Sequence, residues 1–336
     1  MKIGFFDLEG WEHDIILSAF PLGSAELFTN SLTHETLPPR ADFEAISIFM
    51  HTHITEEVLN HFPNLKHIST RSTGYDHIDL ELCRERGISV SYVPGYGDHT
   101  VAEFAFGLLL SLSRHIYEGI HRVRESGLYS ADGLRGVDLN GKIFGVIGTG
   151  RIGCSAAKIG KGFGMEVLGS DPFPNIKAAG EIGFRYVPLE ELLSRADFIS
   201  LHCPLTPETK HLLNRESFSK IKRGAYLINT SRGAVVETAA LVEALKSGTL
   251  AGAALDVLEE EGELGDELAV LADGHPNEDS LKTLLGDHVL MSMQNVLITP
   301  HQAFNSKEAL ERILVVTVDN LRAFMEGVPK NLVSEK

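Results

Sequence analysis

Three ionisable side chains that follow apolar runs could together bind an anion and transfer a proton. They are Arg232, Glu261 and His301. Arginine binds a carboxylate through two parallel hydrogen bonds and stays charged at physiological pH. Histidine exchanges a proton near neutral pH, and a neighbouring carboxylate favours its charged form, raises its pKa and fixes its orientation. The set therefore suits an anionic substrate with an oxygen that gains or loses a proton. Taken singly, each residue also has a structural interpretation, as a loop histidine, one acid of an acidic run or half of an ion pair.

A glycine-rich stretch over residues 142–171 predicts a dinucleotide site. Gly148, Gly150 and Gly153 form G-x-G-x-x-G between an apolar run of strand length and a helix-like segment. The first glycine permits a sharp turn, the second lets backbone amides approach a pyrophosphate, and the third lets the helix sit close to the strand. Asp171 follows 18 residues after Gly153, where it can accept hydrogen bonds from the ribose hydroxyls. Since this carboxylate would repel a 2′-phosphate, we predict NAD rather than NADP as the cofactor.

A reduced nicotinamide beside Arg232, Glu261 and His301 would complete the set needed to reduce a 2-oxo acid. Hydride goes to the carbonyl carbon. Negative charge then develops on the carbonyl oxygen, and this oxygen takes a proton from the histidine. The arginine holds the substrate carboxylate. A metal pair at His51 and His53 is less favoured, because no third ligand is evident nearby, and we predict no metal site.

The elements that must position these residues alternate between strand and helix, which predicts an α/β fold with parallel, doubly wound sheets. Residues 1–100 read as a small α/β unit and residues 101–300 as a larger one, which begins with one long amphipathic segment from Thr100 to about Arg124. Residues 301–336 contain a final helix. Ligands bind such sheets beyond the carboxyl ends of the strands. The expected strands are Ile3–Phe6, Ile46–Phe49, Lys66–Ser69, Ile88–Val90, Ile143–Ile147, Met165–Leu168, Phe198–His202, Tyr226–Asn229, Ala253–Asp256 and Val296–Thr299.

Composition narrows the class of protein. The net charge is −16, which argues against nucleic-acid binding, and no apolar run is long enough to span a bilayer. Three cysteines without CxxC spacing suit a reducing compartment, and the opening MKIGFFDLEG does not read as a signal peptide, so we expect a cytoplasmic protein. The acidic run Glu259–Asp266 is expected to be a solvated loop.

Several motifs together resemble those of the NAD-dependent D-2-hydroxyacid dehydrogenases: GTGRIG, SDPFP, LHCPLTPETKHLLN, NTSRGAVVE, GAALDV and NVLITPHQAF. The resemblance covers nearly the whole chain, and CPLTPETKHLLN and TPHQAF are most similar to the D-lactate dehydrogenase branch. It implies a Rossmann NAD domain inserted into a flavodoxin-like catalytic domain built from residues 1–100 and the C-terminal helix of 301–336. It also implies a homodimer, with D-lactate and pyruvate as the expected substrate pair.

The resemblance also implies roles for individual residues. Arg232 matches the substrate-binding arginine, Glu261 the glutamate that supports the histidine, and His301 the acid/base. Thr73 and Gly74 match a backbone pair that holds the substrate carboxylate. The remaining matches are Tyr96, which reaches the substrate, and the cofactor contacts Arg151, Ile152, Asp171, Cys203, Pro204, Thr209, Thr230, Ser231, Arg232 and Asp256, the last beside the nicotinamide.

Alternatives remain open at this stage. The stretch 262–290 is long, as in the lactate branch, but lacks the aromatic residues expected of fermentative lactate enzymes, so hydroxypyruvate, glyoxylate or a branched 2-oxo acid are alternative substrates. A non-catalytic NAD(H)-sensing scaffold on the same fold is an alternative from another class, because a fold does not fix a function. The presence of Arg232, Glu261 and His301 together weighs against a purely binding role.

Overall fold

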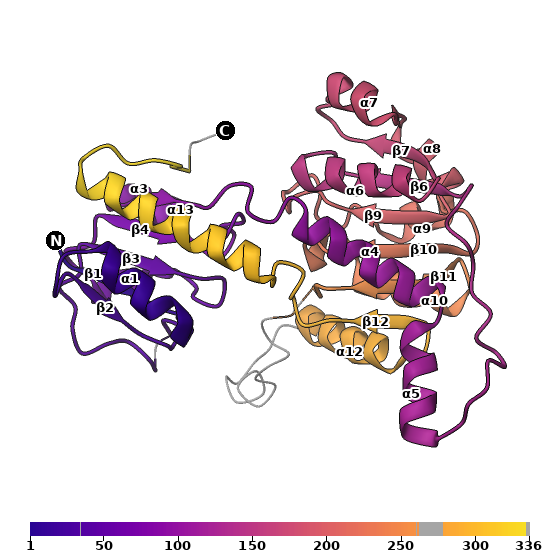
Figure 1. Ribbon diagram of the computed structural model, residues 1–336, viewed down its shortest axis with the longest axis horizontal. Coiled ribbons are helices and arrows are strands. Elements are labelled where there is room, and N and C mark those ends of the chain that lie inside the picture. Colours follow the sequence, from indigo (N-terminus) through magenta and orange to yellow (C-terminus); the bar gives the residue numbers. More distant parts are fainter. Residues whose placement is uncertain (34, 260, 262–277, 334–336) are drawn as a thin grey trace. The chain divides into compact units, whose positions relative to one another are not determined.

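The computed structural model describes residues 1–33, 35–259, 261 and 278–333, and the chain divides into two compact units (Figure 1). Unit 1 comprises Met1–Tyr96 and Ser306–Lys336, and unit 2 comprises Gly97–Asn305. Each unit is built on a parallel β-sheet with helices on both faces, which confirms the predicted α/β class.

Unit 1 holds a five-stranded sheet in the order β2-β1-β3-β4-β5. Its strands pair in parallel, so both faces must be covered, and neighbouring residues of one strand belong to different cores. Ala45 of β3 packs with α1 and α13, whereas Ile46 packs with α2 and α3 on the other face. The elements are β1 (Ile3–Phe5), η1 (Gly10–Glu12), α1 (His13–Ala19), β2 (Ala25–Leu27), β3 (Ala45–Ile48), α2 (Glu56–His61), β4 (His67–Thr70), α3 (Leu80–Glu85), β5 (Ser89–Ser91) and α13 (Lys307–Met325).

Unit 2 holds a seven-stranded parallel sheet in the order β12-β11-β10-β9-β6-β7-β8. Helices α4, α6 and α7 pack on one face, and α8, α9, α10 and α12 on the other. The elements are α4 (Thr100–Ser113), α5 (Ile116–Ser126), β6 (Ile143–Ile147), α6 (Arg151–Gly162), β7 (Glu166–Ser170), α7 (Ile176–Ile182), β8 (Arg185–Tyr186), α8 (Leu189–Arg195), β9 (Phe198–Leu201), α9 (Arg215–Lys220), β10 (Ala225–Asn229), η2 (Gly233–Val235), α10 (Thr238–Lys246), β11 (Leu250–Leu255), α12 (Glu278–Ser292) and β12 (Val296–Ile298).

Every strand expected from the sequence is present, with ends that differ by up to three residues. The prediction of one long amphipathic segment from Thr100 to about Arg124 is wrong. The chain forms two helices here, α4 and α5, which are separated by Arg114 and His115. The break follows from the backbone of His115, which lies in the left-handed region at φ 52° and cannot continue a right-handed helix. Of the four edge strands, β2 and β8 were not predicted.

The structure tests two further expectations from the sequence only within the residues that it describes. In the described ranges, no helix combines the length and apolarity needed to cross a membrane. Of the acidic run Glu259–Asp266, residues 260 and 262–266 lie outside the described residues, so the solvated loop stays a prediction.

A buried histidine should make unit 1 sensitive to acid. His67 on β4 is fully buried, with Nδ1 2.8 Å from Oγ of Ser89 and its ring stacked on Phe324. Burial lowers the pKa of His67 from 6.5 to about 4, so the unfolded chain takes up this proton first. The stabilisation is complete above pH 6.5 and is lost as the pH falls from about 6.5 to about 4, by roughly 2 to 4 kcal/mol.

We expect His67→Phe, which keeps the stacked ring, to reduce this acid-dependent loss. Urea unfolding at pH 7, 6 and 5 measures it, followed by the fluorescence of Trp11, the chain's only tryptophan, which lies in unit 1. His53→Phe is the control, because the His53 side chain is exposed, and should keep the slope of the parent. Equal slopes for the parent and His67→Phe would contradict this assignment.

Candidate active site

A buried carboxylate shapes the turn that carries His301. Asp256, at the end of β11, is 1% exposed, and burial raises its pKa. Its Oδ1 accepts hydrogen bonds from the Thr299 hydroxyl at 2.5 Å and the Gln302 amide at 3.0 Å, while Oδ2 accepts from the Ala303 amide at 2.8 Å. The His301 amide donates to the Asp256 carbonyl at 2.9 Å. The turn after β12 is thus tied to the end of β11, with His301 in a left-handed conformation at φ 47°.

His301 and Glu261 form a direct pair. Nδ1 of His301 lies 2.7 Å from Oε1 of Glu261, and the other carboxylate oxygen accepts from the Leu258 amide at 3.2 Å. Since a carboxylate only accepts, Nδ1 is the donor, and Nε2 is left to face a substrate. The two side chains are 28% and 39% exposed, so a substrate can reach the pair.

Arg232 lies in the turn after the neighbouring strand. Asn229, buried at the end of β10, donates from Nδ2 to the Arg232 carbonyl at 3.0 Å and accepts from the Ser231 amide and hydroxyl at 3.0 and 2.8 Å. The Arg232 guanidinium donates to the Ser231 carbonyl at 2.8 Å. A Cβ on Gly233 would lie 1.9 Å from the Leu258 carbonyl, so this turn packs against the segment that leads to Glu261.

The topology explains why these residues share one edge of the sheet. β12, β11 and β10 are consecutive neighbours and parallel, so their carboxyl ends point the same way. The structure therefore brings Glu261 and His301 into hydrogen-bond contact and places Arg232 in the turn after the next strand. A fixed cation beside a carboxylate–imidazole pair can bind an anion and move a proton.

The glycine turn after β6 forms a cradle that has no room for a side chain at two of its three glycines. A Cβ on Gly148, at φ 85°, would lie 2.5 Å from the Cys203 amide, and one on Gly153 would lie 2.0 Å from the Gly148 carbonyl. By contrast, nothing lies within 4 Å of a Cβ on Gly150, so this position opens to solvent. Arg151 and Ile152 follow in the first turn of α6, where amides have no partner within the helix. This arrangement fits a pyrophosphate.

Asp171 lies directly after β7 and faces this turn. Its Oδ2 accepts from the amide and hydroxyl of Thr149 at 2.6 and 3.1 Å, and Oδ1 accepts from the Phe173 amide at 2.8 Å. A carboxylate has about four acceptor positions, so capacity remains for a ribose hydroxyl. The position agrees with the role predicted for Asp171, which remains a prediction.

The other predicted cofactor residues follow β9 and β10. Cys203 is buried, and burial raises the pKa of its thiol to about 11, so it is not a nucleophile at neutral pH. Pro204 is exposed, and its carbonyl accepts from the Thr209 hydroxyl at 2.6 Å. The Thr230 hydroxyl oxygen is buried without a hydrogen-bond partner among the described residues, which fits a group supplied by a bound dinucleotide.

Unit 1 contains the predicted carboxylate loop after β4. The Thr73 hydroxyl donates to the Val93 carbonyl at 2.7 Å, while within the described residues the amides of Thr73 and Gly74 have no acceptor. Tyr96 is buried, and its carbonyl accepts two hydrogen bonds from Arg312 of α13 at 3.0 and 2.8 Å. Two adjacent free amides at a strand end suit an anion.

Sequence reasoning missed Arg71, which is the first residue of this loop and is 2% exposed. Its guanidinium donates to the Asp7 carbonyl at 2.6 Å and the Ser47 hydroxyl at 3.3 Å, and it lies 5.5 Å from the centroid of the Phe49 ring. The Glu12 carboxylate is 3.8 Å away. An arginine beside a glycine turn was a signal that could have been noted, but its partners are distant in sequence.

Known proteins resemble this chain over most of its length. Residues 106–303 match the family model described as D-isomer specific 2-hydroxyacid dehydrogenase, NAD binding domain. A D-lactate dehydrogenase of Escherichia coli is 40% identical over 90% of this chain and 89% of its own, and a glyoxylate reductase of Korarchaeum cryptofilum is 38% identical over 88% and 84%. The solved D-lactate dehydrogenase from Aquifex aeolicus, complexed with NAD and lactic acid, has a TM-score of 0.84 and 37% identity over 97% of this chain and 96% of that one.

The glycine cradle gives a direct test of the dinucleotide site. We expect Gly153→Ala to push α6 away from the Gly148 carbonyl, which costs about 1 to 3 kcal/mol of stability and weakens NADH binding at least about tenfold. Thermal unfolding and NADH fluorescence titration measure both effects. Gly162→Ala on the same helix is the control, since no atom lies within 4 Å of its Cβ. Equal NADH affinity in the two variants would contradict the proposal that this glycine turn binds the dinucleotide.

Proposed function

Because this chain belongs to the NAD-dependent D-2-hydroxyacid dehydrogenase family, we propose that its substrates are D-lactate and pyruvate. The enzyme is an oxidoreductase with NAD as its cofactor. The observation that carries the proposed chemistry is the 2.7 Å contact between His301 and Glu261, at the strand end next to the Arg232 turn. Similarity to the D-lactate dehydrogenases of Escherichia coli and Aquifex aeolicus supports this substrate pair.

Each residue of the proposed site has a separate role in pyruvate reduction. Bound NADH supplies the hydride to the carbonyl carbon. Arg232 of unit 2 binds the substrate carboxylate. The adjacent amides of Thr73 and Gly74 in unit 1 suit an anion, and we propose that they also bind a carboxylate. His301 donates a proton from Nε2 to the carbonyl oxygen, while Glu261 holds Nδ1 and stabilises the charged imidazole before transfer. Asp171 accepts hydrogen bonds from the adenosine ribose.

Substrate identity is tested by measuring NADH oxidation with pyruvate, hydroxypyruvate, glyoxylate, phenylpyruvate and 2-oxoisocaproate, followed by chiral analysis of the product. We expect the highest kcat/KM with pyruvate and a D-product, because D-lactate dehydrogenases are among the proteins that the chain resembles in sequence and in structure. A preference for glyoxylate or hydroxypyruvate would favour the alternative suggested by the glyoxylate reductase relative. Absence of turnover with all five acids would contradict the proposed chemistry.

A cytoplasmic location is part of the proposal. Cys83, Cys154 and Cys203 are all free thiols, as in proteins of reducing compartments. Burial raises the pKa of Cys83 and of Cys203 to about 11, which keeps both thiols protonated and slow to oxidise.

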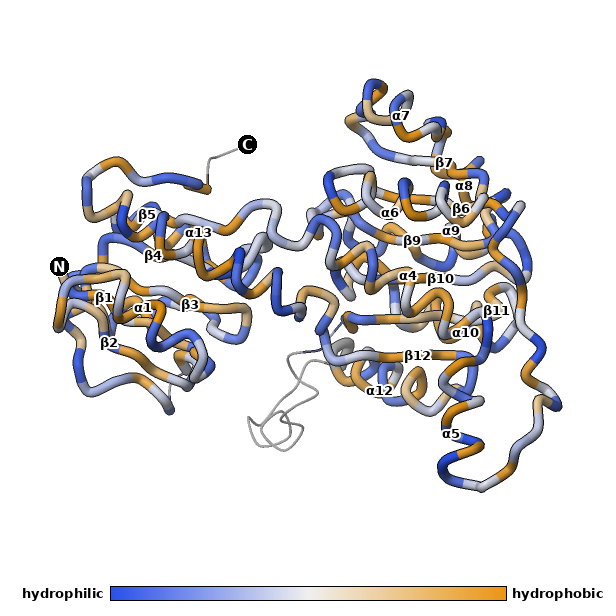
Figure 2. Tube along the Cα trace, viewed as in Figure 1, coloured by the Kyte–Doolittle hydropathy of each residue, from blue (hydrophilic) through white to orange (hydrophobic). Residues whose placement is uncertain are grey.

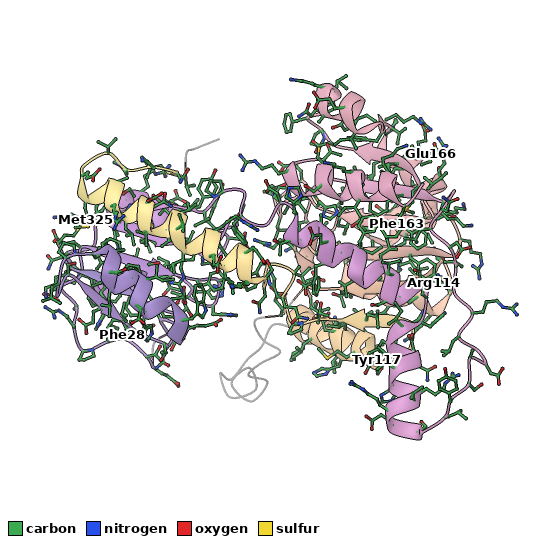
Figure 3. All side chains as sticks on the ribbon, viewed as in Figure 1. Phe28, Arg114, Tyr117, Phe163, Glu166 and Met325 are labelled. Carbon is green, nitrogen blue, oxygen red and sulfur yellow. The ribbon has the colours of Figure 1, made fainter. Side chains whose placement is uncertain are left out.

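We propose that the enzyme is a homodimer, and helix α5 supplies the surface. In Figure 1, α5 extends away from the sheet of unit 2, and among its described residues none is buried. Ile116, Ile120 and Val123 recur at helical spacing and are exposed, as is Tyr117, which is labelled in Figure 3. In Figure 2, hydrophobic and hydrophilic segments alternate along α5. Such an apolar stripe is costly in water and suits a two-fold contact with a second copy.

A single charge in this stripe tests the dimer. We expect Ile120→Lys to shift the protein towards monomer, because the contact would bury an unpaired charge. Light scattering after size exclusion measures the mass. Glu125→Lys introduces the same residue on the opposite side of α5 and should leave the mass unchanged. A parent protein that is monomeric at micromolar concentration would contradict this proposal.

A further inference from the structure

The loop that carries Asp171 is fastened by a tyrosine that has no role in the function proposed so far. Tyr186 lies on the edge strand β8, and its hydroxyl is 2.7 Å from Oγ1 of Thr149 and 2.8 Å from the amide nitrogen of Asn175. Thr149 belongs to the glycine turn after β6. Asn175 ends the short segment 171–175 between β7 and α7. One hydroxyl therefore joins the glycine turn after β6 to the segment that begins with Asp171.

The direction of these hydrogen bonds follows from the chemistry of the groups. The Asp171 carboxylate only accepts, so Thr149 donates both its amide and its hydroxyl hydrogen to Oδ2. Oγ1 of Thr149 then has no hydrogen for Tyr186, and Tyr186 must be the donor to Thr149. The Tyr186 oxygen accepts in turn from the Asn175 amide. The chain runs from Asn175 through Tyr186 and Thr149 to Asp171, and linked hydrogen bonds of this kind strengthen one another.

Local packing keeps the chain of hydroxyls in place. Tyr186 pairs with Gly169 of β7, and a Cβ on that glycine would lie 3.1 Å from Cγ2 of Thr149 and 2.8 Å from the ring of Phe184. Only a residue without a side chain therefore fits beneath the contact between Thr149 and Tyr186. Asn175 is fixed as well, because its side chain accepts from the Ala178 amide at 3.0 Å as the N-cap of α7.

We propose that Tyr186 is a positioning residue for cofactor selectivity, which acts by holding Asp171 and the segment 171–175 in the arrangement that accepts a free ribose. This inference rests on the ribose-binding role proposed for Asp171. A 2′-phosphate brings negative charge and bulk to the carboxylate, so it requires Asp171 to turn away and the segment to open. Opening separates Asn175 from Thr149 and breaks the hydrogen bonds of Tyr186. The tyrosine therefore adds to the barrier against NADPH without touching the reacting atoms.

Tyr186→Phe tests the inference, since it removes one oxygen and keeps the ring. We expect the ratio of kcat/KM for NADH to that for NADPH, measured with a saturating 2-oxo acid, to fall about fivefold to tenfold as KM for NADH rises. The value of kcat should stay within about twofold, because hydride transfer is assigned to the β10–β12 end of the sheet. Thr149→Val breaks the chain one hydroxyl further along and should have a similar effect, and the double variant should add little.

Two comparison variants separate the outcomes. Tyr226→Phe removes a hydroxyl from the same unit that makes no hydrogen bond with the described residues, and should leave the ratio unchanged. Asp171→Ala should lower the ratio further than Tyr186→Phe. If Asp171→Ala lowers it and Tyr186→Phe does not, the role of Tyr186 is overturned while that of Asp171 stands. If neither lowers it, the role of Asp171 fails and this inference fails with it. An equal loss for both cofactors in Tyr186→Phe would indicate only a structural role and would also overturn the inference.

Discussion

The site depends on one buried carboxylate. Asp256 has almost no access to water, and three donors from the turn after β12 satisfy it. A buried carboxylate without hydrogen-bond donors would cost several kcal/mol of stability. The conformation of the Thr299–Ala303 turn that supplies these donors is therefore strongly favoured. Since His301 lies within that turn, the position of the proton donor is set by the need to satisfy Asp256.

Parallel pairing extends this constraint to the rest of the site. Because β10, β11 and β12 are neighbours that end at the same edge, a turn tied to β11 is also held near the turns that flank it. Both oxygens of the Glu261 carboxylate have a partner, one in the Leu258 amide and the other in His301. Two residues earlier, Glu259 accepts from the amide and hydroxyl of Thr238, at the start of α10, and lies 2.5 Å from Nε2 of His211. The carboxylate that supports the histidine therefore does not rest on a single contact.

Much of this could be predicted from the sequence because the informative signals are local. Apolar runs gave the strands of both sheets, and the glycine spacing gave the turn after β6 together with Asp171. Residue chemistry gave Arg232, Glu261 and His301, and the structure places Glu261 and His301 in contact. The edge strands β2 and β8 escaped prediction because they are short and only partly buried, so they lack a clear apolar run.

What could not be predicted depends on contacts between distant residues or on the backbone of one residue. Arg71 is buried only because Asp7, Glu12 and Phe49 come together around it from earlier segments. The break between α4 and α5 depends on the left-handed His115, which an uninterrupted amphipathic pattern does not show. Tyr186 reads as one residue of a short polar strand until its hydroxyl is seen between two loops.

The central claim is that His301, held by Glu261 and the Asp256 turn, supplies the proton for carbonyl reduction. The most direct measurement is the single-turnover rate of NADH oxidation by His301→Gln with the preferred 2-oxo acid, alongside NADH affinity from cofactor fluorescence. The account predicts a rate lower by about 10²-fold to 10⁴-fold with NADH affinity nearly unchanged, because the side chain acts only in proton transfer. A rate close to that of the parent would contradict it and would require another proton donor.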